Sequence, residues 1–265
     1  MHRHYFNMKS WTTVFSLIAT LHVPTLFAQQ QPGYYTLPKM LDVFEGVTVD
    51  DEMYWVYQDS SGIAQYEVAA IFPIGWSEDG KFSYIYKPPS GETGERRFYL
   101  EVIALDTDTV IYSGLLGGMK FYDDDKFSAE WINAHDSIQK VLSKHNIVQT
   151  NNFKLEDFPI VTKSGIQIEN EKIYLNVFNT TDSANYVIKY GLSSLCKGTK
   201  IVYSDSVCCT DGSVWNFGID GYLKSPFDNR IVLIHTWTTR WACGGPPSYR
   251  HIAIIGTHLD YGFTK

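Results

Sequence analysis

The sequence predicts a mostly β protein: a β-rich α+β fold of antiparallel sheets with one central amphipathic helix. Three observations lead to this prediction. Short runs of β-branched and aromatic residues recur along the chain, turn-forming residues separate them, and a single stretch carries apolar residues at helical spacing. The composition, with 44% hydrophobic and 19% charged residues, excludes collagen-like, coiled-coil and largely disordered chains.

Residues 1–28 have the layout of a secretory signal peptide. Arg3 and Lys9 precede an apolar stretch, and Ala28 stands before Gln29 and further glutamines. The apolar stretch has about 13 residues, fewer than the roughly 20 that span a bilayer. We therefore expect cleavage between Ala28 and Gln29, and a secreted or periplasmic location. The mature chain, residues 29–265, is then a single β-rich domain without a transmembrane segment.

The N-terminal lobe, about residues 43–115, is expected to consist of strands and hairpins. Ser77–Gly80 carries Ser, Asp and Gly where a type I turn favours them, and it should join two strands tightly. In the strand that follows, Phe82, Tyr84 and Tyr86 alternate with other residues at the two-residue period of a sheet. A further hairpin is expected around the turn 106–108.

The central helix is expected over about residues 126–145. Its apolar residues recur every three to four positions: Phe127, Trp131, Ala134, Ile138, Val141 and Leu142. The acidic run Asp123–Asp125 precedes the helix, where carboxylates cap free N–H groups and face the positive end of the dipole. Asn146 is expected to end it.

The C-terminal lobe, about residues 153–265, returns to strands. We expect a turn at Glu169–Glu171 between two of them. The last two strands, 230–241 and 249–259, should form a hairpin that places Trp241 opposite Tyr249. In that register His251 faces Thr239, four residues from His235. Two histidines roughly 13 Å apart cannot share one zinc ion.

The four cysteines of the chain are Cys196, Cys208, Cys209 and Cys243. An even number in an exported chain favours disulfide bonds. A bond between the neighbours Cys208 and Cys209 would need a strained peptide. We therefore expect Cys196 and Cys243 each to bond one of the adjacent pair, although a zinc site at Cys208, Cys209 and Cys243 with a histidine is an alternative.

The segment Gly75–Tyr86, with the hairpin that follows it, resembles a blade of the periplasmic TolB-like β-propellers. Those blades repeat a W-S-x-D-G-like turn before an aromatic strand, whereas this chain carries the motif once. Together with the signal peptide, the helix and the β-rich C-terminal half, residues 44–147 resemble an uncharacterised family of predicted secreted or periplasmic bacterial proteins. The resemblance implies a propeller-blade-like N-terminal lobe and brings no catalytic residues.

Motifs that carry catalysis are not evident in the sequence. Gly75-x-Ser77 is followed by Gly80, one residue too late for a nucleophile elbow, and a strand follows instead of a helix. No H-E-x-x-H or C-x-x-C spacing occurs, so no metal site and no cofactor are predicted. The formal net charge of −7 argues against a basic nucleic-acid binder.

A binding surface is best predicted at the tip of the last hairpin. Trp237, Arg240, Trp241, Tyr249 and Arg250 gather there in the sequence. Aromatic faces beside hydrogen-bonding cations suit sugars and peptides. The competing interpretation is that the tryptophans pack into the core. We expect an exported cell-envelope binding or scaffold protein for a glycan, a peptide or an envelope protein. The alternative is a secreted hydrolase that acts on an extracellular polymer such as a glycan.

Overall fold

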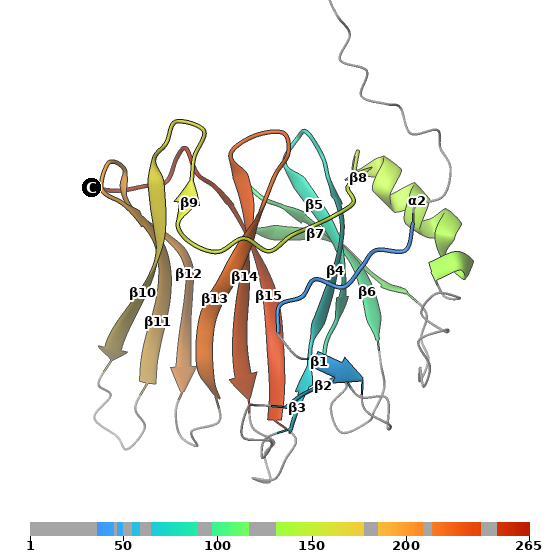
Figure 1. Cartoon of the computed structure of the whole chain (residues 1–265), viewed down its shortest axis with the longest axis horizontal. Helices are drawn as coiled ribbons and strands as arrows, with labels where there is room; N and C mark the ends of the chain where they lie inside the picture. The colour runs from blue at the N-terminus through green and yellow to red at the C-terminus, as the bar shows by residue number, and fades with distance from the viewer. Residues whose placement is uncertain are drawn as a thin grey trace, which may run out of the picture. The chain divides into compact units, whose positions relative to one another are not determined.

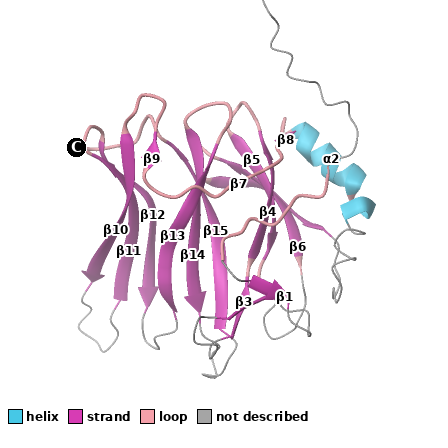
Figure 2. Cartoon of the chain, in the orientation of Figure 1, coloured by secondary structure: helices cyan, strands magenta, loops and turns pink. Residues whose placement is uncertain are grey.

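Three sheets and one helix make up the described part of the chain in this computed structural model (Figures 1 and 2). The structure describes residues 36–44, 47–49, 55–58, 65–89, 97–116, 131–177, 185–208, 214–239 and 248–265. All of them belong to one unit, Tyr35–Lys265. The prediction of a mostly β fold with antiparallel sheets and a helix is confirmed. The expected signal peptide and its cleavage site, Ala28 and Gln29, lie outside the described residues.

The central sheet has six strands in the order β1-β2-β3-β15-β14-β13. They span Val47–Val49 (β1), Trp55–Gln58 (β2), Gln65–Val68 (β3), Val214–Lys224 (β13), Arg230–Thr239 (β14) and Ser248–His258 (β15). All neighbours are antiparallel except β3 and β15, which are parallel. Strands from the beginning and the end of the chain therefore share one sheet.

The second sheet has five strands in the order β7-β6-β5-β4-β8. They are Ala70–Trp76 (β4), Lys81–Lys87 (β5), Phe98–Ala104 (β6), Thr109–Leu116 (β7) and Val148–Gln149 (β8). Strands β4 to β7 form an antiparallel meander with the two predicted hairpins. In the first, the Gly80 amide donates to the Ser77 carbonyl at 3.2 Å, and the Ser77 hydroxyl accepts from the Lys81 amide at 2.8 Å.

The third sheet has four strands in the order β12-β11-β10-β9. Its strands are Ile160–Val161 (β9), Gln167–Val177 (β10), Asn185–Ser194 (β11) and Gly198–Cys208 (β12). The prediction of a turn at Glu169–Glu171 is wrong, because β10 continues through these residues and pairs there with β11. Glu169 and Glu171 are exposed, so their charges stay in water while the backbone ladder continues.

The helix α2 spans His135–Lys144, and a helical turn at 131–133 precedes it. The predicted apolar stripe is confirmed at Trp131, Ile138 and Leu142, which are buried against the five-stranded sheet. Asn146 takes a φ of 56° just after the helix, as expected for its stop. The expected first turn of the helix and the acidic run Asp123–Asp125 lie outside the described residues.

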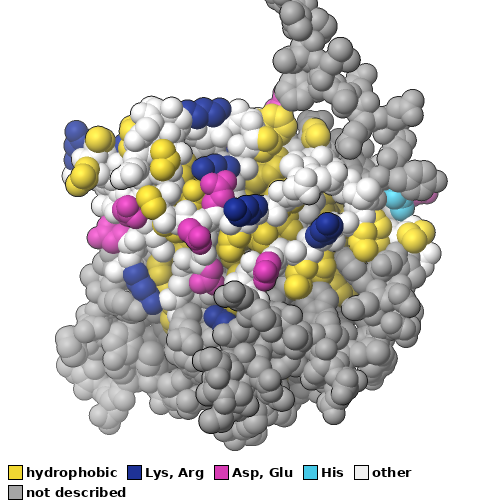
Figure 3. All heavy atoms as spheres, in the orientation of Figure 1, with side chains coloured by type: hydrophobic (Ala, Val, Ile, Leu, Met, Phe, Trp, Pro, Cys, Tyr) yellow, Lys and Arg dark blue, Asp and Glu magenta, His cyan; other side chains and the backbone are white. Residues whose placement is uncertain are grey.

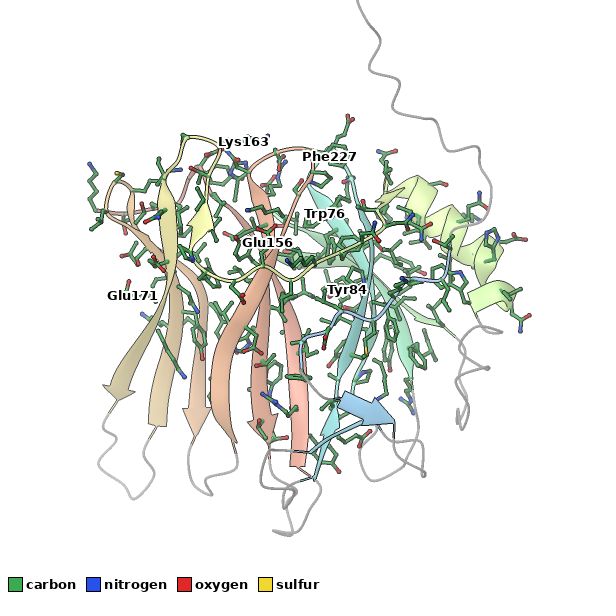
Figure 4. All side chains as sticks on the ribbon, in the orientation of Figure 1. Trp76, Tyr84, Glu156, Lys163, Glu171 and Phe227 are labelled. Carbon is green, nitrogen blue, oxygen red and sulfur yellow. The ribbon has the colours of Figure 1, made fainter. Side chains whose placement is uncertain are left out.

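Hydrophobic clusters join the sheets and the helix into layers. One cluster lies between the central and the five-stranded sheet and includes Trp76 and Tyr84, with Phe227 packed against it (Figure 4). A second joins the five-stranded sheet to α2, and a third joins the central to the four-stranded sheet. Every residue from 231 to 236 in β14 is buried, since the central sheet is covered on both faces.

Candidate functional site

Six rings form one connected group between the central sheet and the four-stranded sheet, and both sheets contribute to it. We call this group the aromatic–histidine row; its members are Tyr190, Tyr203, Phe217, His235, Trp237 and His251. Ring centroids are 4.4 Å apart for Tyr203 and His235, 5.3 Å for His235 and Trp237, and 5.0 Å for Trp237 and His251. The row therefore extends from fully buried His235 to half-buried Trp237 and His251.

Strand alternation and register produce the row. Every second residue of β14 points to the same face, and Trp237 is the cross-strand partner of His251 on β15. The predicted register was wrong by two residues: Tyr249 pairs with Thr239 rather than with Trp241. His251 consequently lies beside Trp237 and still reaches Thr239, whose Oγ1 is 2.8 Å from its Nε2.

The row is electrically neutral at its half-buried end. Burial lowers the pKa of His251 to about 4, so this imidazole is uncharged at neutral pH. Thr239 offers it a hydroxyl partner. Trp237 lies between the imidazoles of His235 and His251, with interplanar angles of 27° and 10°, and its orientation is therefore fixed by two stacked rings.

The residues predicted for the binding surface divide between the two faces of the central sheet. Trp237 and Tyr249 lie on the same sheet face as the row. Thr239 is two residues after Trp237 on β14 and points to that face, and Tyr249 is its cross-strand partner on β15. Arg250 points to the opposite face, where its guanidinium lies 4.2 Å from the ring centroid of Phe44. Arg240 and Trp241 lie outside the described residues.

The disulfide predicted for Cys196 is wrong. Cys196 is an exposed free cysteine in the turn between β11 and β12, whereas Cys208 ends β12. The strand between them holds 11 residues, and at about 3.3 Å per residue it separates the two cysteines by roughly 35 Å. Two cysteines can bond only when their Cα atoms are within about 7 Å. Cys209, Cys243 and the side chain of Cys208 lie outside the described residues.

A second group of polar side chains joins the turn between β6 and β7 of the five-stranded sheet to the central sheet. Arg230 donates two hydrogen bonds of 2.9 Å to Asp106, and the Tyr261 hydroxyl donates to the same carboxylate at 2.6 Å. These contacts lower the pKa of Asp106 to about 2, with the Arg230 hydrogen bonds as the largest cause. Asp108 accepts from the Gly256 amide at 2.6 Å. Both carboxylates hold sheets together, so we assign this group a structural role.

A buried ion pair lies where the chain passes from the central to the five-stranded sheet. The Lys87 Nζ is 4.0 Å from Glu67 Oε1 and donates to the Val68 carbonyl at 3.2 Å. Both side chains are almost inaccessible, at 1% and 4%. Glu67 is also the strand partner of Tyr249. No local pattern reveals this pair, because its members belong to strands that only the tertiary fold brings together.

On the face drawn in Figure 3, acidic and basic side chains are interspersed rather than gathered by sign. Among the described residues, no three His, Cys, Asp or Glu side chains are grouped as a metal ion would require. No helix in this part of the chain is long and apolar enough to cross a membrane. Comparisons with protein-family models, curated proteins and solved structures find no match for the chain.

Proposed function

We propose that the protein is an exported, non-enzymatic binding protein of the cell envelope. Its ligand would contact Trp237, at the half-buried end of the aromatic–histidine row, and Tyr249 on the same sheet face. The observation that supports this proposal is the pairing of Trp237 with His251 and of Tyr249 with Thr239 on one sheet face. Two aromatic rings, an imidazole and a hydroxyl are thereby presented side by side. The expected export rests on residues 1–28.

The chemistry of this surface favours an uncharged ligand with many hydrogen-bonding groups. Thr239 and neutral His251 offer hydrogen bonds without a net charge. The Trp237 ring offers apolar contact in a fixed orientation, which lowers the entropy lost on binding. A neutral glycan meets these requirements and is the first ligand to test, ahead of a peptide or an envelope protein.

The same geometry argues against the alternative of a secreted hydrolase. Thr239 and His251 are within hydrogen-bonding distance, as a nucleophile and its base would be. However, an imidazole whose pKa is near 4 is a weak base at neutral pH. Among the described residues, the histidines paired with a carboxylate are His135 and His258, so no carboxylate there orients the His251 ring. Glycan hydrolysis moreover uses a pair of carboxylic acids, whereas Glu67, the carboxylate in register with Tyr249, is buried beside Lys87.

The proposal is tested by calorimetric titration of the purified protein with oligomers of glucose and of N-acetylglucosamine. We expect one of the two series to bind. Trp237→Ala and Tyr249→Ala each remove a ring and should each weaken its binding by about tenfold, which corresponds to about 1.4 kcal/mol. Tyr112→Ala, which removes the ring of a half-buried tyrosine on β7, is the matched control and should bind as the parent does.

Two results would overturn the proposal. One is that neither series binds, or that the Trp237 and Tyr249 variants bind as tightly as the control. The other is that the protein cleaves either oligomer and that Thr239→Val abolishes the cleavage. Thermal melting of each variant shows whether a loss of binding reflects a loss of fold.

A further inference from the structure

The inner face of the five-stranded sheet carries a second surface, which does not depend on the proposed function. The register of β5, β6 and β7 aligns three rows of side chains across this face. They are Tyr86, Tyr99 and Leu115; Tyr84, Glu101 and Ser113; and Phe82, Ile103 and Val110. We call these nine residues the Glu101 shelf.

The shelf is covered at one side and open at the other. On β5, Phe82 and Tyr84 are buried in the cluster shared with the central sheet, and Tyr84 projects from β5 into it (Figure 4). On β7, Val110 is 47% exposed and Leu115 is 51% exposed. Strand β7 has a bulge of one extra residue opposite Val102 and Ile103. This bulge makes Val110 the partner of Ile103 and so keeps Val110 on the same face of the sheet. The open side thus presents apolar side chains to solvent.

Glu101 is held in place at the centre of the shelf. The Tyr84 hydroxyl donates to Glu101 Oε2 at 2.6 Å, and the Ser113 hydroxyl donates to Oε1 at 3.1 Å. No lysine or arginine of the described chain forms an ion pair with this carboxylate. A fixed and only partly buried carboxylate without a cationic neighbour attracts a cation.

Aromatic rings flank this carboxylate along the strands. Tyr99 is two residues from Glu101 on β6, and Tyr86 is the strand partner of Tyr99. Burial, with Glu101 and Tyr99 nearby, raises the pKa of Tyr86 to about 12, so this phenol stays neutral at physiological pH. Half-buried tyrosine rings beside a carboxylate are the groups that bind alkylammonium ions through charge and cation–π contacts.

We propose that the Glu101 shelf binds an alkylammonium group. The carboxylate of Glu101 would pair with the ammonium, the rings of Tyr86 and Tyr99 would contact its adjoining methylene or methyl groups, and Leu115 would cover the alkyl stem. The hydroxyls of Tyr84 and Ser113 hold the carboxylate and are not contributed to the ligand. A lysine side chain and a free small amine share this chemistry, and the probes in the test distinguish them.

The test uses three probes: N-acetyl-lysine methylamide, choline and the uncharged N-acetyl-norleucine methylamide. Binding to the whole protein is followed by NMR shifts of the backbone amides at physiological salt. We expect the two cations to shift amides of β5, β6 and β7, and the uncharged probe to bind at least about fivefold more weakly. The tighter of the two cations identifies the source of the ammonium.

Glu101→Gln should weaken binding of the tighter cation by about tenfold. Glutamine keeps an oxygen that accepts from Tyr84, so this variant should fold, and its melting temperature verifies this. Glu78→Gln is the matched control, because it removes the same charge from the exposed β4–β5 turn. Equal weakening by both variants, or amide shifts that avoid the shelf, would overturn the proposal, as would a failure of both cations to bind.

Discussion

Arg230 and Asp106 form a two-pronged ion pair between residues that lie 124 positions apart in the chain. Arg230 begins β14 in the central sheet, and Asp106 lies in the turn between β6 and β7 of the five-stranded sheet. Asp228 also pairs with Arg230. A planar guanidinium matches a carboxylate with both of its hydrogen-bond donors, so this contact fixes the two sheets in position as well as in distance.

Replacing Arg230 with lysine should destabilise the protein by about 1 kcal/mol, because lysine keeps the charge but loses the two-pronged geometry. Urea unfolding at low salt measures the change, which should shrink at high salt since Asp106 is 40% exposed. Lys224→Ala is the comparison. Its pair with Glu156 is 40% exposed on both sides, and its loss should cost less than about 0.5 kcal/mol. Equal effects would contradict a special role for Arg230.

Gly80 and Gly165 provide a matched pair of substitutions. Both have a positive φ, 85° and 77°. A Cβ at Gly80 would lie 2.6 Å from Arg230 Nε, whereas one at Gly165 would meet nothing within 4 Å. Gly165→Ala should therefore cost only the backbone strain of about 1 kcal/mol. Gly80→Ala should cost about 2 kcal/mol, because it also displaces Arg230 from Asp106.

The measurement for this pair is the free energy of unfolding, with Arg230→Lys as a second background. In that background the Gly80→Ala penalty should fall toward that of Gly165→Ala, since the contact with Asp106 is already weakened. A Gly80→Ala penalty that is the same in both backgrounds would show that the guanidinium contact does not contribute to it.

The sequence was sufficient for features that depend on neighbouring residues. The turn Ser77–Gly80 was predictable because Gly80 supplies its own positive φ and Ser77 supplies a local hydrogen bond. The helix stripe was predictable because Ile138 and Leu142 lie one turn apart. In contrast, the parallel pairing of β3 with β15 joins strands from opposite ends of the chain, and no local pattern encodes it.

The candidate site was predictable in part, for the same reason. Alternation along a strand identified Trp237, but the length of the hairpin loop, which sets the register, was not encoded in the strand residues. His235 and His251 are stacking partners of Trp237, which their spacing along the two strands does not reveal. No local pattern distinguishes Glu101 or Lys87, because the environment of each arises from strands that pair only in the folded chain.

Cys196 should be the first thiol to react in the folded protein. It is exposed and free in the β11–β12 turn. Brief treatment with a maleimide under native conditions, followed by peptide mass mapping, should show modification at Cys196. Cys196→Ser should abolish this modification and change stability by less than about 0.5 kcal/mol. An unreactive Cys196, or a large loss of stability, would mean that its thiol is engaged in the protein.

The pairing of Cys243 with Cys208 or Cys209 stays a prediction of the sequence. Such a bond would close a loop of about 35 residues and stabilise the fold by a few kcal/mol in the chain-entropy model. Cys243→Ser should then lower the melting temperature under oxidising conditions and leave it unchanged under reducing ones. A melting temperature equal to that of the parent under both conditions would exclude the bond.

Stability should fall as the pH drops from about 6.5 toward 4, because of His251. Its pKa in the folded protein is about 4, below the ordinary histidine value of 6.5, so the unfolded chain binds this proton more readily than the folded one. The contribution of neutral His251 to the free energy of unfolding is complete above pH 6.5 and is lost as the pH falls from 6.5 to about 4. The difference between the two pKa values limits this contribution to at most about 3.4 kcal/mol.

Urea unfolding at a series of pH values measures this contribution, and His251→Gln isolates it. Glutamine does not titrate, and its amide reaches about as far as the Nε2 atom that contacts the Thr239 hydroxyl. The variant should be less stable than the parent at pH 7, because it loses the stacking on Trp237. Its stability should nevertheless decline less steeply between pH 6.5 and 4. Parallel curves for parent and variant would show that His251 is protonated as readily in the folded protein as in the unfolded chain, and that the row around Trp237 is more open to water than its packing indicates.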